Sequence, residues 1–121
     1  MDKLLELQKD ALSEVLDYSG NLIKAAKLLV SELRTERKPD TEELFDLVIK
    51  GINWEIEIYN NCENLINKDN EAIDKQKMVT AVGRLGKVIE EKDDIKIAAC
   101  LDVDFIPFLK AMEYAGLTIG K

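Results

Sequence analysis

Carboxylates are the groups in this 121-residue sequence that could carry out chemistry, because the chain contains no histidine. Glu55, Glu63 and Asp104 fall within or beside apolar stretches, where carboxylates could transfer protons or hold a hard metal ion. Glu55 and Glu63, however, are two helical turns apart and match no catalytic or metal motif. Both can reach a lysine or arginine on a neighbouring helix. An interior carboxylate site, for a metal or a small molecule, is therefore the alternative interpretation.

The missing histidine also removes the chemistry that helical bundles often contain. Di-iron bundles need Glu-x-x-His pairs, haem bundles use an axial histidine, and phosphotransfer bundles carry the phosphoryl group on an imidazole. The sequence has no Walker motif and no serine nucleophile elbow. Gly83-Arg84-Leu85-Gly86 has the form of a nucleic-acid-binding GxxG loop but lies within a helical pattern. We expect no enzymatic activity, no metal and no cofactor.

The composition is typical of one all-α domain. Hydrophobic residues make up 46% and charged residues 34% of the chain, with only two prolines and six glycines. The sequence has no signal-peptide pattern and no apolar run near the ~18 residues of a membrane span, so we expect a cytoplasmic protein that does not contact membranes. Cys62 and Cys100 are expected to be buried thiols, a disulfide between them being the less favoured alternative.

The net charge of -7 disfavours nucleic acids and anionic lipid surfaces as partners. The negative charge is concentrated between residues 39 and 70, which hold eight acidic and two basic side chains. A basic surface on a protein partner is therefore slightly favoured.

The spacing of apolar residues predicts four helices joined by short connections. Apolar residues recur at intervals of three and four along the first helix, as in the seam of a helix pair. The predicted helices cover about 2–35, 41–67, 71–91 and 94–115, in a domain of residues 1–115 followed by an irregular tail, 116–121. Short connections force neighbouring helices to run antiparallel. The predicted fold is an all-α, up-down-up-down four-helix bundle with a long first helix.

Two residues within the predicted helices could interrupt them. Gly20 falls on the polar side of the first helix, which we expect to continue through it, with a break at Ser19-Gly20-Asn21 as the alternative. Pro107 removes one backbone hydrogen bond from the last helix, so we expect a bend there, between Asp104 and Phe108.

Polar residues before each helix predict how it is capped. Asp40 and Glu43 have the spacing of a capping box at the start of the second helix. The polar run from Asn67 to Asn70 is expected to end that helix and cap the third, and Asp93 is the expected cap of the fourth.

The second and fourth helices carry more apolar surface than a bundle needs. Their outer stripes consist of Leu47, Trp54, Ile58 and Leu65, and of Ile95, Ala99, Val103 and Ile106. A helix that is apolar on two sides is either central in its own domain or binds a partner. The partner explanation is favoured, and the alternative is that the long first helix covers Trp54.

One group of motifs resembles a known class of proteins. The resemblance is to small bacterial helical-bundle proteins of unknown function, spans about residues 40–110, and implies a bundle without catalytic residues. In that class a glycine, an aliphatic residue and a tryptophan precede a Glu-x-Lys-Asp hairpin and a proline-bearing last helix. Asp104 stands where the class would have a glutamate, and a closing tryptophan is missing. The residues concerned are Gly51-Ile52-Asn53-Trp54, Glu91-Lys92-Asp93-Asp94, Ala98, Leu101 and Pro107-Phe108-Leu109.

We therefore expect a non-enzymatic protein-interaction module that binds through the outer stripes of its second and fourth helices. A homodimer and an adaptor or chaperone are both compatible with this prediction, the latter by analogy with flagellar export chaperones. A regulatory or toxin-neutralising partner is a further possibility.

Overall fold

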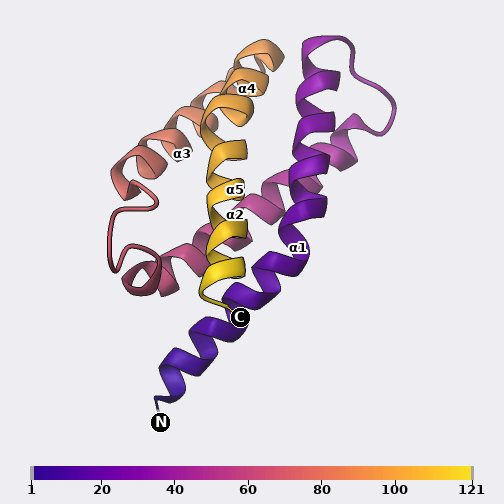
Figure 1. Cartoon of the computed structure of the whole chain (residues 1–121). Coiled ribbons are helices and arrows are strands. Elements are labelled where there is room, and N and C mark those ends of the chain that lie inside the picture. Colours follow the sequence, from indigo (N-terminus) through magenta and orange to yellow (C-terminus); the bar gives the residue numbers. More distant parts are fainter. Residues whose placement is uncertain (1, 121) are drawn as a thin grey trace.

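The structure, a computed structural model, describes residues 2–120. Over this range the chain forms four helical rods and no strands, and successive rods run in alternating directions (Figure 1). The last rod is continuous but contains a π-helical turn. The elements are α1 (Lys3–Arg34), α2 (Thr41–Ile66), α3 (Lys75–Glu90) and the last rod of α4 (Asp94–Cys100), η1 (Leu101–Phe105) and α5 (Ile106–Thr118). The predicted all-α four-helix bundle is confirmed.

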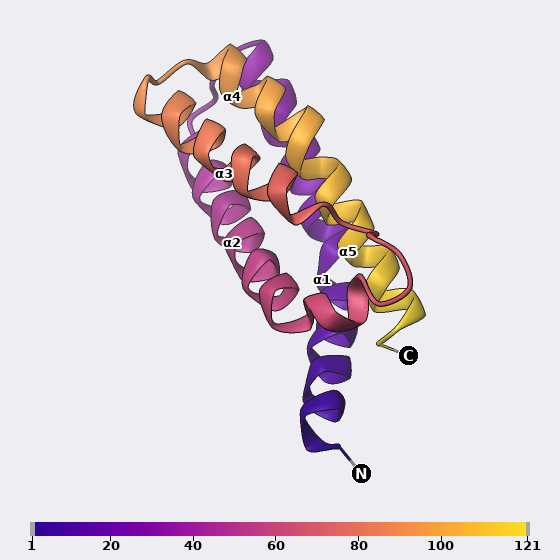
Figure 2. The ribbon, with the colours of Figure 1, turned by 90° about the vertical axis from the view of Figure 1, so that its left-hand side faces the viewer.

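The long helix α1 is the centre of the bundle. It packs against α2 on one side and along the whole last rod on the other, while α3 packs against α4 and η1. It continues through Gly20 without a break, as predicted. Its first turns extend beyond the ends of the other helices (Figures 1 and 2). The buried Gln8 fixes this end by donating hydrogen bonds to the Asn61 carbonyl at 2.7 Å and to Oδ1 of Asn64 at 2.9 Å.

Two glycines mark close approaches to α1. A Cβ atom on Gly116 would lie 2.6 Å from the carbonyl oxygen of Leu12 and 2.9 Å from Cβ of Leu16. A Cβ atom on Gly51 would lie 2.6 Å from Cδ1 of Leu22. Real Cβ contacts are longer than this, so α5 can lie so near the α1 backbone only with glycine at position 116, whereas a side chain at position 51 would require Leu22 to shift.

The start of α2 differs from the predicted capping box. Asp40 occupies the cap position, but its side chain makes no capping hydrogen bond. Instead, Oγ1 of Thr41 accepts from the Lys38 amide at 2.7 Å and donates to Oε1 of Glu32 at 2.6 Å. Because Thr41 and Glu32 are both buried, each satisfies the polar group of the other and ties the end of α1 to the start of α2.

The connection between α2 and α3 is longer than predicted, and α3 begins later than residue 71. The Asn67 side chain spans the connection, since Nδ2 donates to the carbonyl of Ile73 at 3.0 Å and Oδ1 accepts from its amide at 3.1 Å. These bonds hold the buried Ile73 outside a helix. The cap of α3 is therefore Asp74, which accepts from the Lys77 amide at 3.1 Å, and not the polar run that begins at Asn67.

The last rod starts as predicted, because Asp93 accepts a hydrogen bond from the Lys96 amide at 3.1 Å. At the position of the predicted bend, the helix changes to the π-helix η1 just before Pro107, which has no amide hydrogen to donate. The prediction of an irregular tail over residues 116–121 is wrong for residues 116–118, which are helical, and residue 121 lies outside the described range. The chain stays helical to Thr118 because its backbone lies against α1 there.

The remaining predictions concern the cysteines and membranes. Cys62 and Cys100 are free and buried, as predicted. Among residues 2–120, no helix is both long enough and apolar enough to cross a membrane.

Candidate functional site

A groove follows the seam between α3 and the last rod. It consists of two hollows, of about 420 and 240 Å³, which share Val103 and Asp104. We call the two hollows together the seam groove. The larger hollow has an apolar floor and a charged rim. Its floor is Val88, Ala99, Cys100 and Val103, and its rim is Arg84, Lys87, Glu91, Lys96 and Asp104.

The rim of the larger hollow is locally basic on an acidic protein. Arg84 forms an ion pair with Asp104, whose carboxylate also lies 3.5 Å from Sγ of Cys100. Lys96 lies 4.0 Å from Asp93, at the limit of an ion pair, and both side chains are partly exposed. Lys87 forms no ion pair with any residue from 2 to 120. Glu91 and Asp104 also lie on this rim, so its three basic side chains exceed its acidic ones by one, and the rim has a small excess of positive charge beside an apolar floor.

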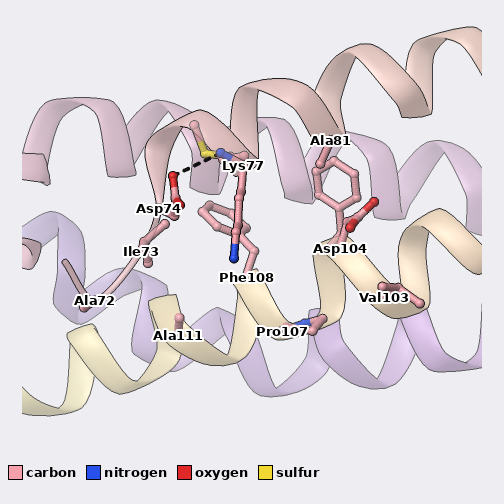
Figure 3. Close-up of a pocket in the computed structure, with 12 residues that line it drawn as sticks. Ala72, Ile73, Asp74, Lys77, Ala81, Val103, Asp104, Pro107, Phe108 and Ala111 are labelled. Atoms are coloured by element: carbon pink, nitrogen blue, oxygen red, sulfur yellow. Dashed lines mark hydrogen bonds between the residues drawn. The ribbon is translucent and has the colours of Figure 1, made fainter.

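The smaller hollow lies between the start of α3 and the η1–α5 junction. Figure 3 shows the Lys77 side chain reaching from α3 toward α5, beside the ring of Phe108. Asp74 bonds to the Lys77 backbone amide, and within residues 2–120 the Lys77 ammonium forms no ion pair. Pro107 and Ala111 line the α5 side (Figure 3). Like the larger hollow with Lys87, this hollow therefore combines an apolar wall with a lysine, Lys77, that has no ion-pair partner among residues 2–120.

The π-helix shapes the groove. A π-helical turn closes i to i+5 hydrogen bonds and holds more residues than an α-helical turn, so it rotates the residues that follow it. Ile95, Ala99 and Val103 remain exposed along one line, and Val103 is 69% exposed. Ile106 was expected to continue this stripe but is only 4% exposed and belongs to the core, because the smaller rotation per residue in the π-helix shifts Ile106 away from the line of Ala99 and Val103. That part of the prediction is wrong.

The predicted stripe on α2 is also interrupted. Ile58 is 7% exposed and part of the core, since α2 packs against both α1 and α5 and buries a wider arc than one inward face. Trp54 is half-buried, its ring edge-on to Tyr18 of α1 at a centroid distance of 5.3 Å. Leu47 is exposed and Leu65 is half-buried.

The two predicted stripes do not form one face. Trp54 lies against α1, whereas Ala99 and Val103 lie beside α3. Since the α2 stripe is partly covered and the stripe on α4 and η1 is open, the seam groove is the stronger candidate for a contact surface.

The structure does not bring the predicted carboxylates together. Glu63 is partly exposed and forms an ion pair with Lys75 at 3.1 Å, while Asp104 pairs with Arg84 at the groove. The prediction that Glu55 and Glu63 reach a lysine or arginine on a neighbouring helix therefore holds for Glu63 and is wrong for Glu55, whose side chain accepts a hydrogen bond from Ser19 instead. No group of three or more Cys, Asp or Glu side chains within residues 2–120 is arranged to hold a metal ion.

Of the three predicted carboxylates, Glu55 is the one that lies in the interior. It is fully buried, and its Oε2 accepts a hydrogen bond of 2.9 Å from the Ser19 hydroxyl, whereas Oε1 has no partner among the described residues. Burial raises its pKa to about 7; the Ser19 hydrogen bond opposes this rise and the negative charge of Glu113 adds to it. No hollow described above opens onto Glu55.

Sequence reasoning missed the basic rim. Arg84 and Lys87 looked like the solvent-facing side of an amphipathic helix, and only their position beside Ala99 and Val103 gives them a role. The Ser19–Glu55 pair left a detectable signal, because a serine stands at a seam position of α1 and a glutamate within the apolar arc of α2.

A family model described as "Domain of unknown function (DUF8042)" matches residues 10–114, a range that reaches into all four helical rods. This agrees with the resemblance to small helical proteins of unknown function. No curated protein and no solved structure matches the chain.

Proposed function

Because the chain belongs to the family of that domain of unknown function, we propose its activity from its own surface: it is a protein-interaction module whose seam groove binds an acidic amphipathic helix of a partner protein. The observation that carries the proposal is the open apolar line of Ala99 and Val103 beside the basic rim of Arg84, Lys87 and Lys96.

The groove has the features of a helix-binding site. Helix-in-groove recognition places apolar side chains at i, i+3, i+4 and i+7 on an apolar floor, while charges at the edges fix orientation. The floor of the groove is made by the two helices that border it. Its rim would pair with acidic residues beside the apolar stripe of the bound helix.

Charge determines which partner fits. The expectation of a basic partner came from the negative charge concentrated between residues 39 and 70, whereas the rim of this groove has an excess of positive charge. A two-fold pairing of two seam grooves would bring Arg84, Lys87 and Lys96 of one copy near the same groups of the other. Like charges facing each other weaken an interface, so an acidic partner fits better. We also propose a cytoplasmic location, which the free thiols favour.

Two designed peptides test this proposal. Both are amphipathic helices with the same leucine stripe, one flanked by glutamates and the other by lysines. Fluorescence anisotropy should show saturable binding of the acidic peptide only, weakening as salt concentration rises. Lys87→Glu combined with Lys96→Glu should weaken binding at least about tenfold, which is about 1.4 kcal/mol.

Lys50→Glu is the matched control, because it makes the same charge change at an exposed position of α2 outside the groove. It should leave binding nearly unchanged. Equal binding of both peptides, or equal effects of the groove and control variants, would show that the seam groove is not the binding site.

A further inference from the structure

The first turns of α1 have an unpartnered apolar edge. Leu4 and Leu7 are 61% and 65% exposed, on turns that extend past the ends of the other helices (Figures 1 and 2). Ala11 lies on the same side, because residues i, i+3 and i+7 share one face of a helix, but it is half-buried and packs against the core, so the unpartnered edge consists of Leu4 and Leu7. We call residues 2–11 the α1 arm.

The α1 arm is also acidic on one side. Beside Lys3, the carboxylates Glu6, Asp10 and Glu14 follow one another at intervals of four, so this side of the helix holds three negative charges and one positive charge, next to the exposed leucines. All three are exposed, and none forms an ion pair with another residue from 2 to 120. Exposed leucines beside a line of carboxylates are the chemistry that the seam groove would bind.

We propose that the helix bound in the seam groove is the α1 arm of a second copy of this chain, exchanged reciprocally in an antiparallel homodimer. This rests on the proposed function of the groove. Leu4 and Leu7 of one copy pack on Ala99 and Val103 of the other. Glu6 and Asp10, with Glu14 beyond the arm, face the basic rim of the larger hollow.

The position of the arm excludes binding within one chain. The arm leaves the bundle at one end, whereas the larger hollow lies near the α3–α4 connection at the other (Figure 1). Because α1 is one unbroken helix of 32 residues, about 48 Å long at 1.5 Å per residue, its first turns cannot reach their own groove.

Reciprocal exchange also removes the charge conflict of a groove-to-groove dimer. In a two-fold interface, if residue i contacts residue j, then j contacts i, so an arm of each copy can occupy the groove of the other. The basic rims then face acidic arms instead of each other. Each copy contributes an arm and a groove, which doubles the buried surface relative to one docking contact.

Sedimentation of the full chain over a concentration series tests the exchange. The wild type should dimerise. An arm variant, Leu4→Asp with Leu7→Asp, and a groove variant, Lys87→Glu with Lys96→Glu, should each raise the dimer dissociation constant at least about tenfold. Circular dichroism should show both folded, because all four positions are exposed. Lys50→Glu is again the control.

Mixing the arm variant with the groove variant tests the exchange more directly than either variant does alone. The arm variant retains an intact groove and the groove variant an intact arm, so their mixture should associate more tightly than either variant alone. Adding Glu6→Lys and Asp10→Lys to the groove variant should restore the dimer, because the reversed charges again pair. A wild-type dimer that neither variant weakens would overturn the exchange.

The acidic peptide separates this inference from the proposed function. If the wild type stays monomeric at every concentration but the arm variant binds the peptide, the exchange is wrong and the groove function stands. If the wild type is monomeric and the peptide does not bind, both are wrong. If the groove function and the arm exchange are both correct, the arm variant should bind the peptide more tightly than the wild type does, because no arm occupies its groove.

Discussion

The Ser19 hydroxyl of α1 donates a 2.9 Å hydrogen bond to Oε2 of Glu55 on α2, inside the core. This bond satisfies one carboxylate oxygen, while Oε1 has no hydrogen-bond partner among residues 2–120. A buried carboxylate with one unsatisfied oxygen is costly when it is ionised and much less so when it is protonated. The pair therefore couples the packing of α1 on α2 to pH.

Stability should fall as pH rises toward neutrality. Burial raises the pKa of Glu55 from 4.5 to about 7, so the folded state binds the proton more tightly than the unfolded chain does. The resulting stabilisation is complete below the unfolded-state pKa and is lost as pH rises through the folded-state value, a change of about 3 kcal/mol. Urea unfolding measured from pH 4.5 to 8 should show this loss.

Glu55→Gln should flatten that pH dependence and be more stable than the wild type at pH 8, since the amide keeps the acceptor for Ser19 without the charge. Glu63→Gln is the matched control, because Glu63 is partly exposed in an ion pair and its loss should cost no more than about 1 kcal/mol. A Glu55→Gln protein with an undiminished pH slope would contradict this assignment.

Glycine substitutions should have opposite effects on two helices. Gly116→Ala should destabilise the protein by about 1–3 kcal/mol, because its Cβ would lie 2.6 Å from the backbone oxygen of Leu12, which no side-chain rotation can relieve. Gly86→Ala should stabilise it by about 0.5–1 kcal/mol, since the added Cβ on α3 would meet no atom within 4 Å apart from its chain neighbours and its own helix backbone. Thermal or urea unfolding measures both, and equal effects would contradict the packing of α5 on α1.

The two thiols should be unreactive in the folded protein. Burial is the main cause that raises the pKa of the Cys100 thiol, to about 11, and it also raises that of Cys62. Since the thiolate is the reactive form, a disulfide reagent at pH 8 should modify neither thiol until the protein is unfolded in urea. Single Cys62→Ala and Cys100→Ala variants assign each thiol. Rapid modification of the folded chain would disprove the burial.

The sequence alone determined the helices in which apolar residues recur at regular intervals. Apolar residues at intervals of three and four indicate which side of a helix faces the core. The sequence therefore predicted α1, the span of α2 and the bundle topology. Capping by Asp93 was predictable for a similar reason, because a cap bonds to amides in its own first turn.

Only the tertiary structure decided which residues from different helices lie side by side, and where the number of residues per helical turn changes. Ile106 turns inward because η1 alters the rotation per residue, and Ile58 is covered because α2 packs on two neighbours. The basic rim exists because α3 places Arg84 and Lys87 beside the exposed line of α4 and η1. A periodic pattern describes one helix, whereas a groove forms from the positions of two, and those positions follow from the packing of the whole bundle.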